Sequence, residues 1–342
     1  MAVWQCAARR LFLARDRIGV KPLFYAKTAD GMIFGSEIKT ILADRRIKPQ
    51  LDVQGAAQVL LLGPGRMPGS GVFKGIDELE PGHWAVFEDG QLRVKQYWKL
   101  TDREHTESLE ETLDHIRWLV TDAIRRQMVS DVPIGCFLSG GLDSSIICAV
   151  CSKEIDGIAT FSVDYQDNDR YFVPSKFQPN SDSDYISLMA DYIGASSNFI
   201  TLDTDMLVDA LFEAAEARDL PGMADVDSSM LLLCREARKS STVVLSGECA
   251  DEIFGGYPWF YRPEMLERPF FPWLHDPFAR ASLFDPAFAS PDAGYRSLSA
   301  HYKAFVASVE RIGEDDDEMY RSRIATQLSV WYFMQSLLER KD

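Results

Sequence analysis

The chain has little basic charge and little cysteine, and each shortage excludes a class of protein. Its 342 residues include 36 Lys and Arg against 52 Asp and Glu, which gives a formal net charge of −16 at pH 7. A chain this acidic is not expected to coat nucleic acid, because polyanion binding needs dense Lys and Arg. Six cysteines are too few for a disulfide-stapled scaffold and indicate a compartment where thiols stay reduced.

The sequence also lacks long apolar segments. No run approaches the roughly 20 apolar residues that a membrane-spanning helix needs, and the first ten residues show no secretory signal. We therefore expect a cytoplasmic protein with neither a membrane nor a nucleic-acid partner. What is present is a hydrophobic fraction of 46%, enough for a full core. The length predicts about two domains at roughly 150 residues each.

Hydrophobic periodicity changes near residue 104. Before it, short strand-like runs alternate with two Asp-Gly hairpin turns, at residues 30–31 and 89–90. Helices are expected at 36–42, capped by Ser36, and at 53–62. After residue 104, apolar residues recur every three to four positions from Leu109 to Met128, which predicts an amphipathic helix. We place a domain boundary between residues 104 and 105.

Beyond residue 132, strand-like and helix-like segments alternate. Strands are expected at 134–138, 158–163, 198–202 and 242–245, and helices at 146–151, 184–193, 206–218 and 228–239. Such alternation predicts an α/β fold with a doubly wound parallel sheet. Ligands of these folds bind beyond the carboxyl ends of the strands, so the segments that follow the strands are the candidate sites.

A glycine-rich motif, Ser-Gly-Gly-Leu-Asp-Ser at residues 139–144, follows the first of these strands. Two glycines let the backbone approach an anion, and the helix that follows offers free N–H groups to it. Asp143 adds a carboxylate, which suits a phosphate site only if a cation bridges the two, so the motif indicates a polyphosphate with Mg²⁺. It lacks the Gly-Lys-Ser/Thr ending of a Walker A loop. The structural alternative is an ordinary strand-to-helix turn with a capping residue.

The motif resembles the PP-loop of the ATP pyrophosphatases. A second motif, Leu-Ser-Gly-Glu-Cys-Ala-Asp-Glu-Ile-Phe-Gly-Gly-Tyr at residues 245–257, resembles the signature of glutamine-hydrolysing asparagine synthetases. Residues 14–23, 34–39 and 79–83 resemble the late part of that family's glutaminase domain. The resemblance spans nearly the whole chain, in the family's order. It implies a partial αββα N-terminal-nucleophile glutamine amidotransferase domain at 1–104 and a PP-loop synthetase domain at 105–342.

The resemblance also implies a reaction and its residues. The parent enzyme would be a carbon-nitrogen ligase that converts L-aspartate to L-asparagine through β-aspartyl-AMP, using ATP, Mg²⁺ and ammonia from L-glutamine. By matched position, Glu248 serves the aspartyl-AMP chemistry, Asp143 and Asp251 serve the metal, and Asp16 remains from the glutamine site. ATP would contact Leu138, Ser139, Gly140, Gly141, Asp143, Ser144, Val163, Ser246 and Gly247. The resemblance leaves a homodimer open.

The chain departs from the family at both ends, which suggests a fragment. The family's glutaminase nucleophile is a cysteine at the mature N-terminus, whereas here Met1 and Ala2 come first and Cys6 is internal. We therefore expect no glutaminase activity. The family's pyrophosphate-contacting lysine is also expected to be missing. The alternatives are another PP-loop amidotransferase, a β-lactam-type synthetase, or a nucleotide-binding fragment without turnover. Cys148 and Cys151 are expected to be core thiols, and the five histidines show no metal-site spacing.

Overall fold

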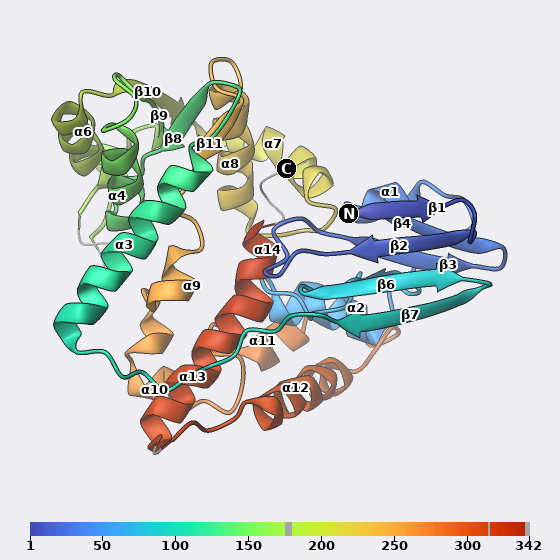
Figure 1. Cartoon of the computed structure of the whole chain (residues 1–342). Helices are drawn as coiled ribbons and strands as arrows, with labels where there is room; N and C mark the ends of the chain where they lie inside the picture. Colours follow the sequence, from blue (N-terminus) through green and yellow to red (C-terminus); the bar gives the residue numbers. More distant parts are fainter. Residues whose placement is uncertain (175–179, 314, 339–342) are drawn as a thin grey trace. The chain divides into compact units, whose positions relative to one another are not determined.

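The computed structural model describes residues 1–174, 180–313 and 315–338, and the chain divides into two units (Figure 1). The first unit comprises Met1–Glu104, Arg218–Gly222 and Asp251–Asp342, and the second comprises His105–Ala217 and Met223–Ala250. Among the described residues, no helix has the length and apolar character to cross a membrane.

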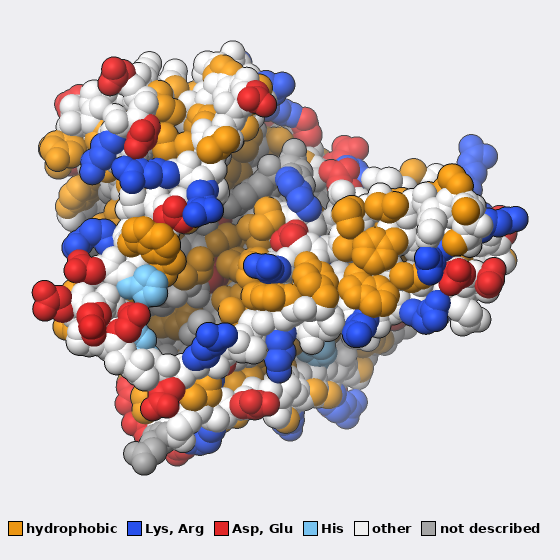
Figure 2. Space-filling view, viewed as in Figure 1, with side chains coloured by type: hydrophobic (Ala, Val, Ile, Leu, Met, Phe, Trp, Pro, Cys, Tyr) orange, Lys and Arg blue, Asp and Glu red, His pale blue; other side chains and the backbone are white. Residues whose placement is uncertain are grey.

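Two antiparallel sheets form the N-terminal part of the first unit. Their strand orders are β1-β2-β6-β7 and β4-β3-β5. The strands are β1 (Ala2–Gln5), β2 (Arg10–Ala14), β3 (Phe24–Thr28), β4 (Gly31–Gly35), β5 (Asp77–Glu78), β6 (His83–Glu88) and β7 (Gln91–Gln96). Their shared core is made of buried side chains from both sheets: Leu11, Leu13, Leu23, Tyr25, Leu79 and Ala85. Figure 2 shows further hydrophobic side chains gathered on the surface over the strands of the first sheet.

The predicted hairpin turn at Asp89-Gly90 is confirmed: it joins β6 to β7, and both residues have positive φ, as a two-residue type I′ turn requires. A hairpin also joins β3 to β4, but its turn is at residues 29–30, one position before the predicted Asp30-Gly31, because Gly31 already pairs with Thr28. The prediction that Ser36 caps the next helix is wrong. Helix α1 (Ile38–Leu42) starts after Glu37 without a side-chain cap, and the Ile38 N–H instead donates to Asp219 Oδ2 at 2.5 Å. A distant carboxylate thus satisfies the free N–H that a local serine was expected to take.

The rest of the first unit is helical. It contains α2 (Val53–Ala57), the π-helix η1 (Gln58–Leu62), the 3₁₀ helix η2 (Pro258–Phe260), α10 (Pro263–Leu266), α11 (Pro277–Ala281), α12 (Pro291–Ser308), α13 (Asp317–Leu328), the π-helix η3 (Ser329–Met334) and α14 (Gln335–Leu338). Asp52 caps α2 by accepting from the Gly55 N–H. These helices share a core rich in aromatic side chains, including the fully buried Phe271 and Tyr332.

The second unit confirms the predicted α/β fold. Its sheet is parallel, in the order β10-β9-β8-β11. The strands are β8 (Ile134–Phe137), β9 (Ala159–Tyr165), β10 (Ser196–Leu202) and β11 (Val243–Leu245). The helices are α3 (Leu109–Gln127), α4 (Leu142–Cys151), α5 (Asn168–Tyr171), α6 (Asp182–Ile193), α7 (Thr204–Ala217) and α8 (Ala224–Ala237). The short helix α9 (Ala250–Phe254) begins where the chain leaves this unit.

Helix α3 forms where its periodicity predicts, and Ser108 and Glu111 close a capping box at its start. Its apolar stripe is not used evenly. Ile124 is buried in the core beneath β8, whereas Leu109 is 76% exposed. Sequence periodicity therefore predicts which face of a helix is apolar, but not which part of that face is covered.

Candidate active site

The Gly-rich loop leaves β8 and enters α4, and two serine hydroxyls hold its shape. The Ser144 hydroxyl is buried, accepts from the Ser139 N–H at 3.2 Å, donates to the Gly141 carbonyl at 3.2 Å, and lies 3.0 Å from the Ser139 hydroxyl. The structure uses the Ser144 hydroxyl inside the loop, where it fixes the turn. The contact of Ser144 with ATP that the resemblance implies stays a prediction.

Strand β9 fixes Leu138, the residue just before the loop. Leu138 donates its N–H to Phe161 O at 3.0 Å, and its carbonyl accepts from the Ser162 hydroxyl at 2.6 Å. Val163 lies two residues before the end of β9, since that strand runs to Tyr165 rather than ending at Val163 as the sequence suggested. Whether Leu138 and Val163 contact a nucleotide stays a prediction.

The two glycines of the loop differ in what surrounds them. Gly140 has φ +78°, and a Cβ there would lie 2.9 Å from Asp182 O and 3.0 Å from Ile186 N, against the first turns of α6. Gly141 has ordinary φ, and a Cβ at that position would have Ser139 Oγ as its nearest neighbour, at 3.4 Å. Gly140 is thus required by packing, whereas Gly141 leaves open space in front of the helix.

The start of α4 fits an anion. Gly141 occupies the capping position without a side-chain cap. The N–H groups of Gly140 and Leu142 have no acceptor within the parts of the chain that are described. These donors and the helix dipole favour negative charge at this point. Burial raises the pKa of the Asp143 carboxyl above its usual value, because burial outweighs the opposing bond from its own backbone. A nearby cation would relieve that cost, so the residues fit a phosphate with Mg²⁺.

The second motif lies directly beside this loop. A Cβ at Gly247 would lie 2.9 Å from Ser144 N and 3.0 Å from Asp143 Cβ, so its backbone touches the start of α4. Ser246 turns the chain here, because its hydroxyl accepts from the Glu248 N–H at 3.1 Å. Two segments that are about 100 residues apart in the sequence thereby meet at the carboxyl edge of the parallel sheet, as the fold class predicts.

Cys249 is a feature of the site that sequence reasoning missed. It has φ +74°, a left-handed conformation that is costly for a residue with a Cβ. It sits between Glu248, the candidate catalytic residue, and helix α9, so the strained turn sets the direction in which the chain leaves β11. The sequence carries no signal for it, since residues that favour positive φ are usually Gly or Asn.

Asp251 belongs to the first unit and Asp143 to the second, so their pairing on one cation stays a prediction. Across residues 1–174, 180–313 and 315–338, no three His, Cys, Asp or Glu side chains cluster to hold a metal. Mg²⁺ bound with a nucleotide ordinarily takes several of its ligands from phosphate oxygens and water.

A cluster of polar residues at 225–229 lies in the first turns of α8. Asp227 is buried, and its Oδ2 accepts from the Met223 N–H at 2.8 Å. The Ser229 hydroxyl donates to Asp225 O and lies 3.0 Å from the Tyr165 hydroxyl at the end of β9. Much of the cluster thus serves to start the helix and join it to the sheet.

The Cys-x-x-Cys pair is confirmed as core. Cys148 and Cys151 are fully buried on α4, next to the equally buried Cys136 of β8. Hydrogen bonding with Cys148 is the main cause that raises the pKa of Cys136 to about 12. The pKa of Cys151 is raised as well, so Cys136 and Cys151 stay protonated at neutral pH. All three buried residues act as small apolar side chains beneath the loop.

In the first unit, Asp16 organises the loop after β2. Its Oδ1 accepts from the Gly19 and Val20 N–H groups at 2.7 and 2.9 Å, and its Oδ2 accepts from the Lys21 N–H at 3.1 Å. Burial alone would raise the pKa of Asp16, but these bonds and the neighbouring Arg15 lower it below its usual value. Asp16 therefore stays ionised and exposed, a state that suits a positively charged ligand group.

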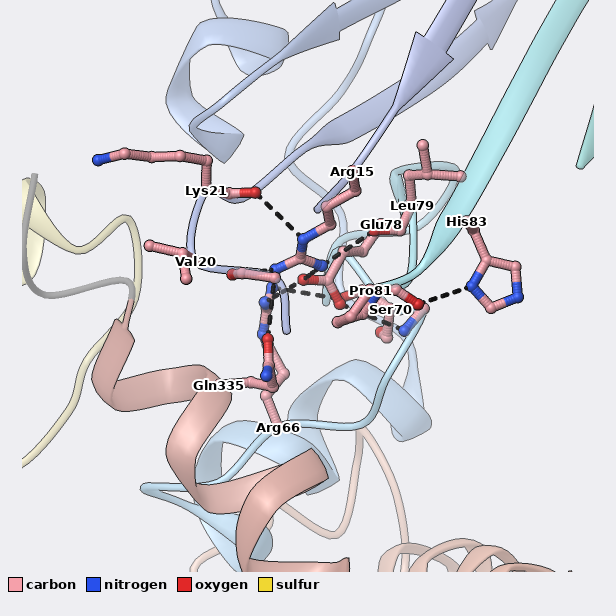
Figure 3. Close-up of polar contacts among 12 residues, drawn as sticks. Arg15, Val20, Lys21, Arg66, Ser70, Glu78, Leu79, Pro81, His83 and Gln335 are labelled. Carbon is pink, nitrogen blue, oxygen red and sulfur yellow. Dashed lines mark hydrogen bonds and ion pairs between the residues drawn. The ribbon is translucent and has the colours of Figure 1, made fainter. Parts of the chain in front are cut away.

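A buried charge network supports the same loop (Figure 3). Glu78 accepts from Arg15 at 2.5 Å and from Arg66 at 2.9 Å, and the three side chains are almost completely buried. Burial would raise the pKa of Glu78, but the two guanidinium groups hold it below its ordinary value. Arg15 also donates to the carbonyls of Gly19 and Lys21, both at 3.2 Å. The loop is thus fixed from its N–H side by Asp16 and from its carbonyl side by Arg15.

Comparison with known proteins agrees with this geometry. Residues 115–342 match the family model described as asparagine synthase, and residues 1–98 match the glutamine amidotransferase domain. The chain is 43% identical to asparagine synthetase [glutamine-hydrolyzing] 3 of Bacillus subtilis, over 100% of this chain and 56% of that protein.

More distant relatives also match most of the chain. A putative asparagine synthetase [glutamine-hydrolyzing] of Methanocaldococcus jannaschii is 31% identical over 72% of the chain and 47% of that protein. Amidase chry2 of Gibberella zeae is 26% identical over 79% of the chain and 41% of that protein. The chain spans about half the length of the curated relatives it matches. From the family model and the match of the whole chain to part of the Bacillus protein, the chain belongs to the asparagine synthase family.

Proposed function

We propose that the protein catalyses the ATP-dependent amidation of L-aspartate to L-asparagine, with glutamine as the parent enzyme's source of ammonia. The observation that carries this proposal is the contact of the two motifs in the second unit, where Gly247 lies against Asp143 and Ser144. That contact brings an anion-binding helix start and the Glu248 segment to one edge of the sheet. Adenylation and amide formation need these two functions side by side.

In the proposed reaction, a β-carboxylate oxygen of aspartate attacks the α-phosphorus of ATP, and pyrophosphate leaves. The nitrogen of ammonia then attacks the acyl carbon of β-aspartyl-AMP, and AMP leaves. The open N–H groups at the start of α4 would hold phosphate oxygens, and Mg²⁺ would neutralise their charge. Glu248 would take a proton from the attacking nitrogen. Asp143 and Asp251 would act through the cation.

The test is aspartate-dependent release of pyrophosphate from Mg²⁺-ATP. We expect Asp251→Asn to weaken Mg²⁺-ATP binding by about tenfold or more, because it would remove a cation ligand. We expect Glu248→Gln to bind nucleotide nearly normally while turnover falls by about 10²- to 10⁴-fold. Glu154→Gln is the control, because Glu154 lies on the surface of the second unit and pairs with Arg125.

The outcomes separate the alternatives. Release stimulated by another carboxylate but not by aspartate would identify a different PP-loop synthetase. Nucleotide binding without any release would identify a binding fragment. If Glu248→Gln loses nucleotide binding as strongly as Asp251→Asn, the separate roles are wrong and both residues belong to one metal site.

We also propose that a polypeptide of these 342 residues hydrolyses no glutamine by itself. Cys6 is the cysteine within residues 1–98, and it lies in the turn after β1, where its nitrogen is an amide rather than a free amine. It therefore lacks the base that an N-terminal nucleophile uses. Glutamate release from glutamine above a no-enzyme control would contradict this proposal.

A further inference from the structure

Gln335, the first residue of α14, reaches the loop that Asp16 organises. It is 4% exposed, and its Nε2 donates to the Ile18 carbonyl at 2.7 Å although the two residues are 317 positions apart. Its Oε1 accepts from Arg15 Nη2 at 3.4 Å. Figure 3 shows the amide beside the Arg15 guanidinium. One side chain from the segment that matches the asparagine synthase model thus contacts both the loop and the arginine that supports it.

The fit around this amide is tight. Gly19 has φ +77°, and a Cβ there would lie 2.7 Å from Gln335 Oε1 and 2.6 Å from Pro81 Cγ. The close approach of loop and amide therefore depends on glycine at this position. A side chain at position 19 would require the Gln335 amide or Pro81 to shift.

Three side chains form hydrogen bonds with the backbone of this loop. Its N–H groups at 19, 20 and 21 are held by Asp16, its carbonyls at 19 and 21 by Arg15, and its carbonyl at 18 by Gln335. Asp16 and Arg15 belong to the loop's own segment. Gln335 ties this loop to the C-terminal helices, and removing its amide takes away one bond to the Ile18 carbonyl and one to Arg15.

We propose that Gln335 is a positioning residue for the glutamine-binding loop. By fixing the Ile18 carbonyl and the Arg15 guanidinium, it holds residues 18–21 in the arrangement in which their N–H groups bond the Asp16 carboxylate, the group that would bind the substrate's ammonium group. This inference rests on the proposed role of Asp16 toward glutamine. It means that the amidotransferase-matched segment, residues 1–98, takes part of its site geometry from α14.

The experiment measures the loop directly, without turnover. Hydrogen exchange at the amides of residues 19–21 is compared in the wild-type chain, Gln335→Met and Gln327→Met. Gln327 is the matched control, because it donates to Asp102 and makes no contact with the loop. We expect Gln335→Met to exchange about five- to tenfold faster at these amides, the effect of one lost buried hydrogen bond. Gln327→Met is expected to exchange like wild type.

The second readout is the titration of Asp16, followed by the ¹³C signal of its carboxyl. A residue that only stabilised α14 would leave it unchanged, whereas Gln335→Met should raise the Asp16 pKa toward its ordinary value. Gln335→Glu keeps an acceptor for Arg15 but loses the donor to Ile18, and should show intermediate exchange. It also serves if the Met variant does not fold.

Unchanged exchange and titration in both Gln335 variants would overturn the proposal, and so would equal changes in Gln327→Met. Neither readout uses ATP, aspartate or glutamine. A failed ligase assay would therefore refute the proposed function without affecting this result, and the reverse also holds.

Discussion

The loops at residues 16–21 and 139–144 both follow a strand and both contain an aspartate, but they are built in opposite ways. In the first, the Asp16 carboxylate accepts three backbone N–H groups and so uses up the loop's donors. In the second, serine hydroxyls hold the turn and the donors at the start of α4 stay open. The first loop presents a carboxylate that its own backbone stabilises, whereas the second offers free N–H groups to an anion.

The two aspartates differ accordingly. Backbone bonds and Arg15 overcome burial and lower the pKa of Asp16, whereas burial raises the pKa of Asp143. An aspartate after a strand therefore indicates a site only in combination with its neighbours' N–H groups. Where the neighbouring N–H groups bond to the carboxylate, they stabilise its ionised form and lower its pKa. Where they do not, the ionised carboxylate needs another partner, such as a cation.

The largest expected effect concerns the support of the first loop. Glu78→Gln leaves the buried charges of Arg15 and Arg66 without their counter-ion, so we expect a loss of about 3–5 kcal/mol in the free energy of unfolding. Chemical denaturation of the variant measures it. Glu88→Gln, which breaks an exposed pair with Arg93, should cost less than about 1 kcal/mol. Similar losses in both variants would show that the network does not carry the loop.

The next effect separates packing from ligand approach in the second loop. Gly140→Val should lose about 2–4 kcal/mol, because its Cβ would meet the backbone of α6 in a left-handed conformation. Gly141→Ala meets only Ser139 Oγ at 3.4 Å and should keep its stability. It should nevertheless lose Mg²⁺-ATP affinity, since the methyl group lies where phosphate would approach.

Thermal unfolding and nucleotide titration of both variants check this. Normal ATP affinity in Gly141→Ala would show that phosphate does not approach the loop there. A stable Gly140→Val would contradict the packing argument. The pair therefore tests fold and site separately, which Gly140→Val alone cannot do.

The sequence predicts the strands, the hairpins and the parallel sheet because these follow from local periodicity and turn residues. It also predicts that the two motifs share a sheet edge, because the fold class places them there. It does not predict the cap of α1 by Asp219, the internal use of the Ser144 hydroxyl or the strain at Cys249. Each of these depends on a partner or a backbone path that the fold supplies, so no local pattern records it.

A smaller effect concerns pH. Because the folded pKa of Asp16 lies below its ordinary value of 3.8, its ionised form stabilises the fold at neutral pH, and this contribution is lost as pH falls through the folded pKa. Asp16→Asn should therefore cost about 1 kcal/mol or less near pH 7, since the site is exposed. The difference from wild type should shrink below pH 4. Denaturation between pH 2 and 7 measures it, and a constant difference across that range would contradict the assignment.

The smallest effect has the opposite sign and completes the comparison. The folded pKa of Asp143 is raised by burial, so its ionised form opposes folding at neutral pH, and that cost disappears as pH falls below the folded pKa. Asp143→Asn should therefore leave the free energy of unfolding unchanged or raise it slightly, by a few tenths of a kcal/mol. With Mg²⁺-ATP present the order should reverse, because a ligand that binds the native state stabilises wild type through the cation and the variant much less. If Asp143→Asn destabilises the free protein as Asp16→Asn does, the Asp143 carboxylate already has its partner within the fold, as the Asp16 carboxylate does.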